Sequence, residues 1–100
     1  MQELEERSDA LRLEILGNVR GGFVDYNSSA ERVRITDQQV QEAREAYALA
    51  ERRYRTGISQ YVELTQARTV LNNARMTHEQ ARSDRRRAAF RLLSQMEQLP

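Results

Sequence analysis

Apolar and small residues recur along two stretches of the chain at alternating steps of three and four. In the first half they occupy Val33, Thr36, Val40, Ala43, Tyr47, Ala50 and Tyr54. In the second half they occupy Leu64, Ala67, Leu71, Ala74, His78, Ala81, Arg85, Ala88 and Leu92. An average spacing of 3.5 residues is typical of the narrow contact stripe of a coiled coil, here called the seam. The pattern therefore predicts two long helices, each with one seam.

A short interruption separates the two stretches at residues 55–59. Gly57 lies where a helix commonly ends in a left-handed residue. Ser59 is placed to cap the helix that follows, and Glu63 in the first turn of that helix suits the positive end of its dipole. The chain is therefore expected to reverse direction here.

Folding the chain at Gly57 brings the two seams together in register. The register pairs Tyr54 with Tyr61, Tyr47 with Ala67, Ala43 with Leu71, Val40 with Ala74, Val33 with Ala81, Tyr26 with Ala88 and Gly22 with Leu92. We therefore predict an all-α fold, a long antiparallel two-helix coiled-coil hairpin over residues 1–100. It has a helix at about 2–55, a tip turn at 56–59 and a helix at about 60–98. The first dozen residues of the first helix overhang the second.

Two features indicate that this hairpin needs neighbours. Gly17, Gly21 and Gly22 weaken the first helix by roughly 1 kcal/mol each relative to alanine, and they indicate either a kink or a close approach of another helix. Further apolar residues lie off the seam, namely Ala46, Leu49, Val70, Ala89, Leu93 and Met96. Because a lone hairpin this thin is marginally stable, we expect self-association or a place in a larger protein.

Composition excludes other fold classes. Four glycines and one proline among 100 residues are too few to form the turns of a sheet protein. Charged residues make up 31% of the chain, and its net charge of +1 favours neither nucleic acid nor an anionic membrane. The first fifty residues carry ten acids and six arginines, whereas the last fifty carry five acids and ten arginines. Such opposite halves suit an antiparallel pairing within the chain.

No arrangement of residues indicates catalysis, so the chain is not expected to be an enzyme or to bind a cofactor. There is no cysteine, and the single histidine, His78, lies on the seam, so no metal site is expected. The basic run Arg85–Arg87 has no interleaved aromatic residue and is interpreted as a solvated or acid-paired helix face rather than a nucleic-acid contact.

The turn and its flanks carry a family resemblance. Residues 48–68 read ALAERRYRTGISQYVELTQAR. This segment resembles the tip of the periplasmic hairpins in the TolC family of outer-membrane efflux channels. The matching positions are Arg53, Tyr54, Gly57, Ile58, Tyr61, Glu63, Leu64, Ala67 and Arg68. Residues 38–44 and 71–75 are also similar to that family, and the resemblance spans about residues 24–98.

The resemblance implies a structural role in transport. Proteins of this family are trimers in which each protomer contributes two such hairpins to a hollow periplasmic α-barrel, anchored in the outer membrane. Small molecules or proteins pass through, and an inner-membrane pump is reached through a periplasmic adaptor. By this resemblance the chain is a fragment of a larger channel protein, on the periplasm-facing side of the outer membrane. Alone, it is expected to form a dimer or bundle.

The resemblance also implies site residues. The tip residues Thr56, Gly57, Ile58 and Ser59 match the positions that contact the adaptor. Glu63 matches an acid at the channel entrance, and Tyr54 matches an aromatic residue that takes part in closure. Gln66 stands where some members have a second acid, and Ser59 stands where some have an arginine, so the ion pairs of the gate differ here.

Two other interpretations remain open at this stage. One is a generic coiled-coil spacer or oligomerisation module. The other is an adaptor-protein hairpin, whose tip normally presents a different motif containing arginine and leucine.

Overall fold

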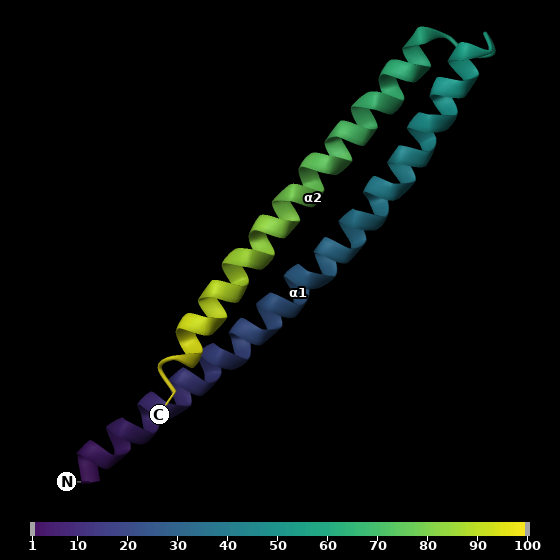
Figure 1. Ribbon diagram of the computed structural model, residues 1–100. Coiled ribbons are helices and arrows are strands. Elements are labelled where there is room, and N and C mark those ends of the chain that lie inside the picture. Colours follow the sequence, from purple (N-terminus) through teal and green to yellow (C-terminus); the bar gives the residue numbers. More distant parts are fainter. Residues whose placement is uncertain (1, 100) are drawn as a thin grey trace.

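Two helices, α1 (Gln2–Arg55) and α2 (Tyr61–Met96), make up the computed structural model, which describes residues 2–99. They run antiparallel and form a rod whose Cα atoms extend over 83 × 15 × 14 Å (Figure 1). The described residues contain no strand. The predicted all-α hairpin is therefore confirmed. α2 ends at Met96, two residues before the predicted end, and a turn follows in which Gln98 N–H donates to Gln95 O.

The buried faces of both helices follow the predicted seams, although Val19 and Ser29 are buried without having been predicted and the seam residue Tyr54 is exposed. On α1 the buried residues are Val19, Gly22, Ser29, Thr36, Val40 and Ala43, and on α2 they are Leu64, Leu71, Ala81, Ala88 and Leu92. Val40, Ala43 and Leu71 form the core cluster, with Tyr47 and Ala74 packed against it. Large residues therefore face small ones, as the predicted register requires.

Tyr47 closes this core cluster toward the tip. The Arg68 guanidinium lies 5.8 Å from the centre of the Tyr47 ring, and its Nη2 donates a hydrogen bond of 3.2 Å to the Tyr47 hydroxyl. The register explains why Arg68 and Tyr47 meet, since Arg68 directly follows Ala67, the residue paired with Tyr47. A cation over an aromatic face at a partly exposed site stabilises the contact by roughly 0.5–1 kcal/mol.

The three glycines of the first arm do not interrupt α1, which is one continuous helix (Figure 1). Gly22 is buried, and a Cβ atom added to it would collide with Gln95 Oε1 and lie 3.1 Å from Leu92 Cδ1. Gly17 and Gly21 have no such neighbour within 4 Å. Close helix approach therefore explains Gly22 alone, and nothing in the structure explains the other two.

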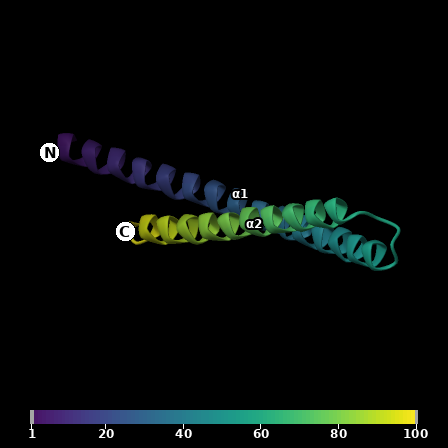
Figure 2. The ribbon, with the colours of Figure 1, turned by 90° about the horizontal axis from the view of Figure 1, so that it is seen from above.

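The N-terminal part of α1 extends past the end of α2 (Figure 2). We call residues 2–18 the overhang, because Val19 is the first buried residue of α1 and Gly22 is already level with Leu92 and Gln95. Leu4, Leu11, Leu13 and Leu16 are exposed on it. The seam thus ends with α2, although α1 continues for nearly five more turns.

Candidate functional site

The tip of the hairpin is a tight helix-ending turn. Gly57 has φ +76°, so it adopts the left-handed conformation predicted for it. Its N–H donates to Tyr54 O at 3.1 Å, and the N–H of Ile58 donates to Arg53 O at 2.9 Å. These two bonds, one nested inside the other, define a Schellman motif, in which the last carbonyls of a helix are satisfied by the residues that follow it. The turn is therefore set by backbone geometry.

Ile58 is the most prominent side chain of this turn. In a Schellman motif the residue at its position usually packs against an apolar side chain five residues earlier. That position is Arg53 here, so Ile58 has no apolar partner in the motif and is 70% exposed. Thr56 is also exposed, but its hydroxyl is bound to the end of α1, 3.1 Å from both Arg52 O and Arg53 O. The tip therefore presents one aliphatic side chain to its surroundings.

Ser59 does not cap α2, and that prediction is wrong. The N-cap is Gln60, with extended backbone angles and no side-chain capping bond, and its carbonyl accepts from Glu63 N–H at 3.1 Å. Ser59 N–H is drawn back toward α1, donating to Arg53 O at 3.3 Å. Its Oγ atom is enclosed, and no described residue hydrogen-bonds to it. The N–H groups of Gly57, Ile58 and Ser59 all bond back to α1, and the cap of α2 falls on the next residue, Gln60.

The predicted entrance residues lie on both sides of the turn. The Tyr54 ring meets the Tyr61 ring edge to face, with centroids 5.8 Å apart, so the predicted pairing of these two residues is confirmed. Glu63 and Gln66 are exposed on the first turns of α2. Aromatic pairs in this geometry contribute roughly 0.5–1.5 kcal/mol beyond their area. The tyrosine pair thus ties the two helices together directly beneath the tip.

The tip is basic on the α1 side. Arg52, Arg53 and Arg55 occupy the last turn of α1, where cations oppose the negative end of the helix dipole. Arg55 also pairs with Glu51 at 3.6 Å. A partner that meets Ile58 at the tip therefore also meets guanidinium groups.

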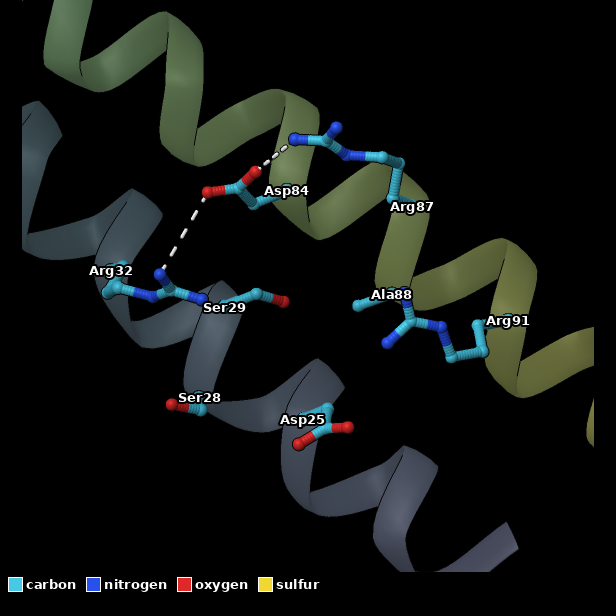
Figure 3. Close-up of a pocket in the computed structure, with 8 residues that line it drawn as sticks. All are labelled: Asp25, Ser28, Ser29, Arg32, Asp84, Arg87, Ala88 and Arg91. Carbon is cyan, nitrogen blue, oxygen red and sulfur yellow. Dashed lines mark hydrogen bonds and ion pairs between the residues drawn. The ribbon is translucent and has the colours of Figure 1, made fainter. Parts of the chain in front are cut away.

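A second polar site lies along one edge of the hairpin (Figure 3). It is a groove of about 430 Å³, lined by Asp25, Ser28, Ser29, Arg32, Asp84, Arg87, Ala88 and Arg91. Asp84 accepts hydrogen bonds from Arg87 and from Gln80, and its other oxygen lies 3.9 Å from Arg32 across the two helices. The Arg87 hydrogen bond, followed by that of Gln80, holds the pKa of the Asp84 carboxyl below its ordinary value.

This groove was not predicted from the sequence. The run Arg85–Arg87 was interpreted as a solvated or acid-paired helix face, and the pairing of Arg87 with Asp84 agrees with that interpretation. The signal that could have revealed the groove is positional, because Asp25, Arg32, Asp84 and Arg91 each directly precede a seam residue. Residues in that position from the two helices share one edge of an antiparallel pair.

Neither a metal site nor a membrane-spanning helix is found among residues 2–99. No group of three or more histidine, aspartate and glutamate side chains there is arranged to hold a metal ion. Neither helix combines the length and apolar character needed to cross a bilayer.

Comparison with known proteins assigns the chain to a family. A family model described as "Outer membrane efflux protein" matches residues 1–96. No curated protein and no solved structure matches the chain. The family model covers both helices and the tip between them, which are the segments on which the resemblance rests. The chain belongs to the outer membrane efflux protein family, a family of TolC-like channel proteins rather than enzymes.

Proposed function

We propose that this hairpin forms part of the periplasmic α-barrel wall of a trimeric efflux channel, as an internal portion of a larger channel protein. Its tip, Thr56–Ser59, docks a periplasmic adaptor that connects the channel to an inner-membrane pump. The observation that carries this proposal is Ile58, an aliphatic side chain exposed at the end of an 83 Å rod with no apolar partner in its turn. Family membership favours this function over a generic coiled-coil spacer.

The outer face of α2 supports a place in a barrel wall. Val62, Met76 and Phe90 are spaced by two heptads, on the side of α2 opposite the seam, and all are exposed. Thr69 and Ser83 lie between them, so this stripe carries no charge from residue 62 to residue 90. A helix with apolar stripes on two opposite sides has a neighbour on each side, as a closed wall of helices requires.

The tip assignment is tested by Ile58→Asp in the channel protein that contains this hairpin. A buried apolar anchor at an interface contributes roughly 2 kcal/mol or more, and aspartate would place an unpaired charge there. Export and crosslinking to the adaptor should both fall, while trimer assembly is retained because Ile58 lies outside the seam. Gln41→Asp, an equivalent charge on the exposed middle of α1, is the matched control. Normal export and crosslinking by the Ile58→Asp channel would exclude docking at the tip.

For the entrance, we propose that Glu63 and Gln66 line the constriction and that Tyr54 takes part in closing it. Glu63 and Gln66 are exposed one turn apart at the tip end of α2, and Tyr54 is in contact with Tyr61. Carboxylates from three protomers would form a ring that binds cations. Glu63→Gln should therefore weaken the block of channel conductance by divalent cations. Glu45→Gln, on the exposed arm, is the control and should leave the block unchanged.

A further inference from the structure

A second groove, here called the basic groove, contains three arginines, and no acid among residues 2–99 lines it. Its volume is about 310 Å³, and its lining residues are Arg44, Tyr47, Arg68, Leu71, Asn72 and Arg75. The three arginines each directly follow a seam residue, whereas Arg32 and Asp84 in the groove of Figure 3 directly precede one. Because successive residues are turned by about 100° around a helix, the two grooves lie on opposite edges of the hairpin.

The register brings the three arginines of the basic groove together from both helices. Arg68 and Arg75 are seven residues apart on α2, about 10 Å along its axis. Ala43 packs with Leu71 in the core cluster, and Leu71 lies between these two arginines in the sequence. Arg44, which follows Ala43, therefore reaches the edge between Arg68 and Arg75. One arginine of α1 thus stands opposite two arginines of α2.

The acids on this edge are engaged elsewhere. Three acids directly follow a seam residue, and each lies near another basic side chain, in the pairs Asp37–His78, Glu51–Arg55 and Glu79–Arg82, at 3.9, 3.6 and 3.2 Å. None of the six ion pairs within residues 2–99 involves an arginine of the basic groove. Like charges on neighbouring positions are destabilising, so an anion in this groove would remove a repulsion as well as gain an attraction.

Tyr47 holds one of the three arginines in place. The Arg68 guanidinium lies 5.8 Å from the centre of the Tyr47 ring and donates to its hydroxyl at 3.2 Å. The hydroxyl accepts this bond with its oxygen and keeps its own proton to donate. A guanidinium that is positioned in advance loses less side-chain freedom when it binds a ligand. The basic groove therefore presents hydrogen-bond donors from Arg44, Arg68, Arg75, Tyr47 and the Asn72 amide, a set that suits a ligand rich in acceptor oxygens.

The groove of Figure 3 has the opposite arrangement of charge. It also contains three arginines, but Asp25 and Asp84 line it with them. Asp84 accepts a hydrogen bond from Arg87 and lies 3.9 Å from Arg32, so much of the positive charge there is balanced within the chain. Of the two grooves, only the basic groove has no carboxylate of residues 2–99 in its lining. It is therefore the better site for an anion.

We propose that the basic groove binds a small anion with two or more phosphate groups, held by Arg44, Arg68 and Arg75, with Tyr47 and Asn72 as further hydrogen-bond donors. Guanidinium groups bind phosphate oxygens through pairs of parallel hydrogen bonds. Each phosphate group carries about −1.5 to −2 charges near pH 7, so two of them balance three guanidinium groups, whereas a single carboxylate balances one. The site lies on the arms of the hairpin, outside the tip, and does not depend on the proposed function.

Isothermal titration calorimetry with pyrophosphate tests the proposal on the 100-residue chain, with circular dichroism to verify that each variant is as helical as the wild type. Arg75→Gln should raise the Kd about tenfold, because it removes a charged hydrogen-bond donor from the groove. Arg82→Gln is the matched control, since it removes the same charge from the same edge one heptad further along α2, where Arg82 is already bound to Glu79. It should leave the Kd within about threefold. Acetate, which has one carboxylate, should bind at least about tenfold more weakly than pyrophosphate.

NMR of the arginine side chains locates the bound anion. Pyrophosphate should shift the Nε–Hε signals of Arg44, Arg68 and Arg75 by more than those of the arginines in the groove of Figure 3. Equal losses of affinity in Arg75→Gln and Arg82→Gln would show only a general attraction to basic charge and would overturn the proposal. Largest shifts in the groove of Figure 3, or no binding at millimolar pyrophosphate, would overturn it as well. Neither experiment involves the adaptor or export, so failure here is distinct from failure of tip docking.

Discussion

Thr36 Oγ1 and His78 Nδ1 lie 2.9 Å apart across the seam, in a layer flanked by apolar residues. The Thr36 hydroxyl is also 2.7 Å from Arg32 O. A hydroxyl has one proton, and donating it to that carbonyl leaves an oxygen lone pair for His78. The Nδ1 atom of His78 is then the donor, and its Nε2 faces Asp37 at 3.9 Å. The Thr36 hydroxyl and the His78 Nδ1 atom are therefore paired across the seam, which is why a histidine is tolerated there.

Thr36→Val should destabilise the hairpin by about 1 kcal/mol, because it leaves the His78 N–H unpaired inside the seam. For a domain of this size, that corresponds to a fall in Tm of roughly 4–8 °C. The measurement is thermal unfolding followed by circular dichroism.

The matched control is the double variant Thr36→Val, His78→Leu. Replacing both partners of a hydrogen bond by apolar groups is close to neutral or stabilising. The double variant should therefore recover at least the stability lost by Thr36→Val. If both variants are destabilised equally, the hydrogen bond across the seam contributes nothing.

Gly21 and Gly22 form a natural matched pair. Gly21→Ala should raise the free energy of unfolding by about 1 kcal/mol, since alanine is the better helix former and the site is open. Gly22→Leu should lower it by roughly 1–3 kcal/mol, because the larger side chain would collide with Leu92 and Gln95. Urea denaturation measures both. A Gly22→Leu variant as stable as Gly21→Leu would show that the helices do not approach closely here.

The register was predictable because it depends on spacing alone. The steps from Val33 to Tyr47 and from Leu64 to Leu71 can be read along the chain without knowledge of any contact, and a constant register then follows from one turn. The left-handed Gly57 was predictable for the same local reason. The family resemblance used these same positions, and the family match agrees with it.

The position of the α2 cap was not predictable from spacing, and for the groove of Figure 3 spacing indicates only the shared edge, not the contacts that form on it. The cap depends on how many residues the turn consumes, and that number is set by the nested bonds from Gly57 and Ile58 to α1. The groove depends on side-chain reach, since Arg32 and Asp84 meet only because both extend along the same edge. Both the position of the cap and the contacts in the groove depend on two helices, so neither can be read from the spacing along one of them.

Gly57→Val should destabilise the chain by at least about 1 kcal/mol. The cause is conformational, because φ is +76° while no neighbouring atom lies within 4 Å of the added Cβ. Gly57→Asn is the control, since asparagine enters the left-handed region more readily and should cost less. Thermal unfolding compares the two, and equal losses would show that space around the residue, rather than backbone conformation, sets the cost.

Hydrogen bonds to Asp84 make the unfolding free energy of the chain depend on pH in the acid range. The pKa of the Asp84 carboxyl is held below its ordinary value, by the Arg87 hydrogen bond first and by Gln80 second. Ionised Asp84 therefore stabilises the folded state at any pH above its unfolded pKa of about 3.9, and this contribution is lost as pH falls through the lower folded pKa. The difference in unfolding free energy between the wild-type chain and Asp84→Asn should be constant from about pH 5 to 7 and shrink below about pH 4.

An NMR titration of the Asp84 side chain separates the contributions that Arg87 and Arg32 make to its pKa. Arg87→Gln should move the carboxyl pKa back toward its ordinary value by more than Arg32→Gln does, because Arg87 donates a hydrogen bond whereas Arg32 acts only through charge at 3.9 Å. The Arg32 contribution should also decline as salt is raised, since charges in solvent are screened over about 10 Å at 0.1 M ionic strength. If Arg32→Gln moves the Asp84 pKa by more than Arg87→Gln does, then the ion pair across the helices, rather than the pair within α2, is the main cause of the lowered pKa.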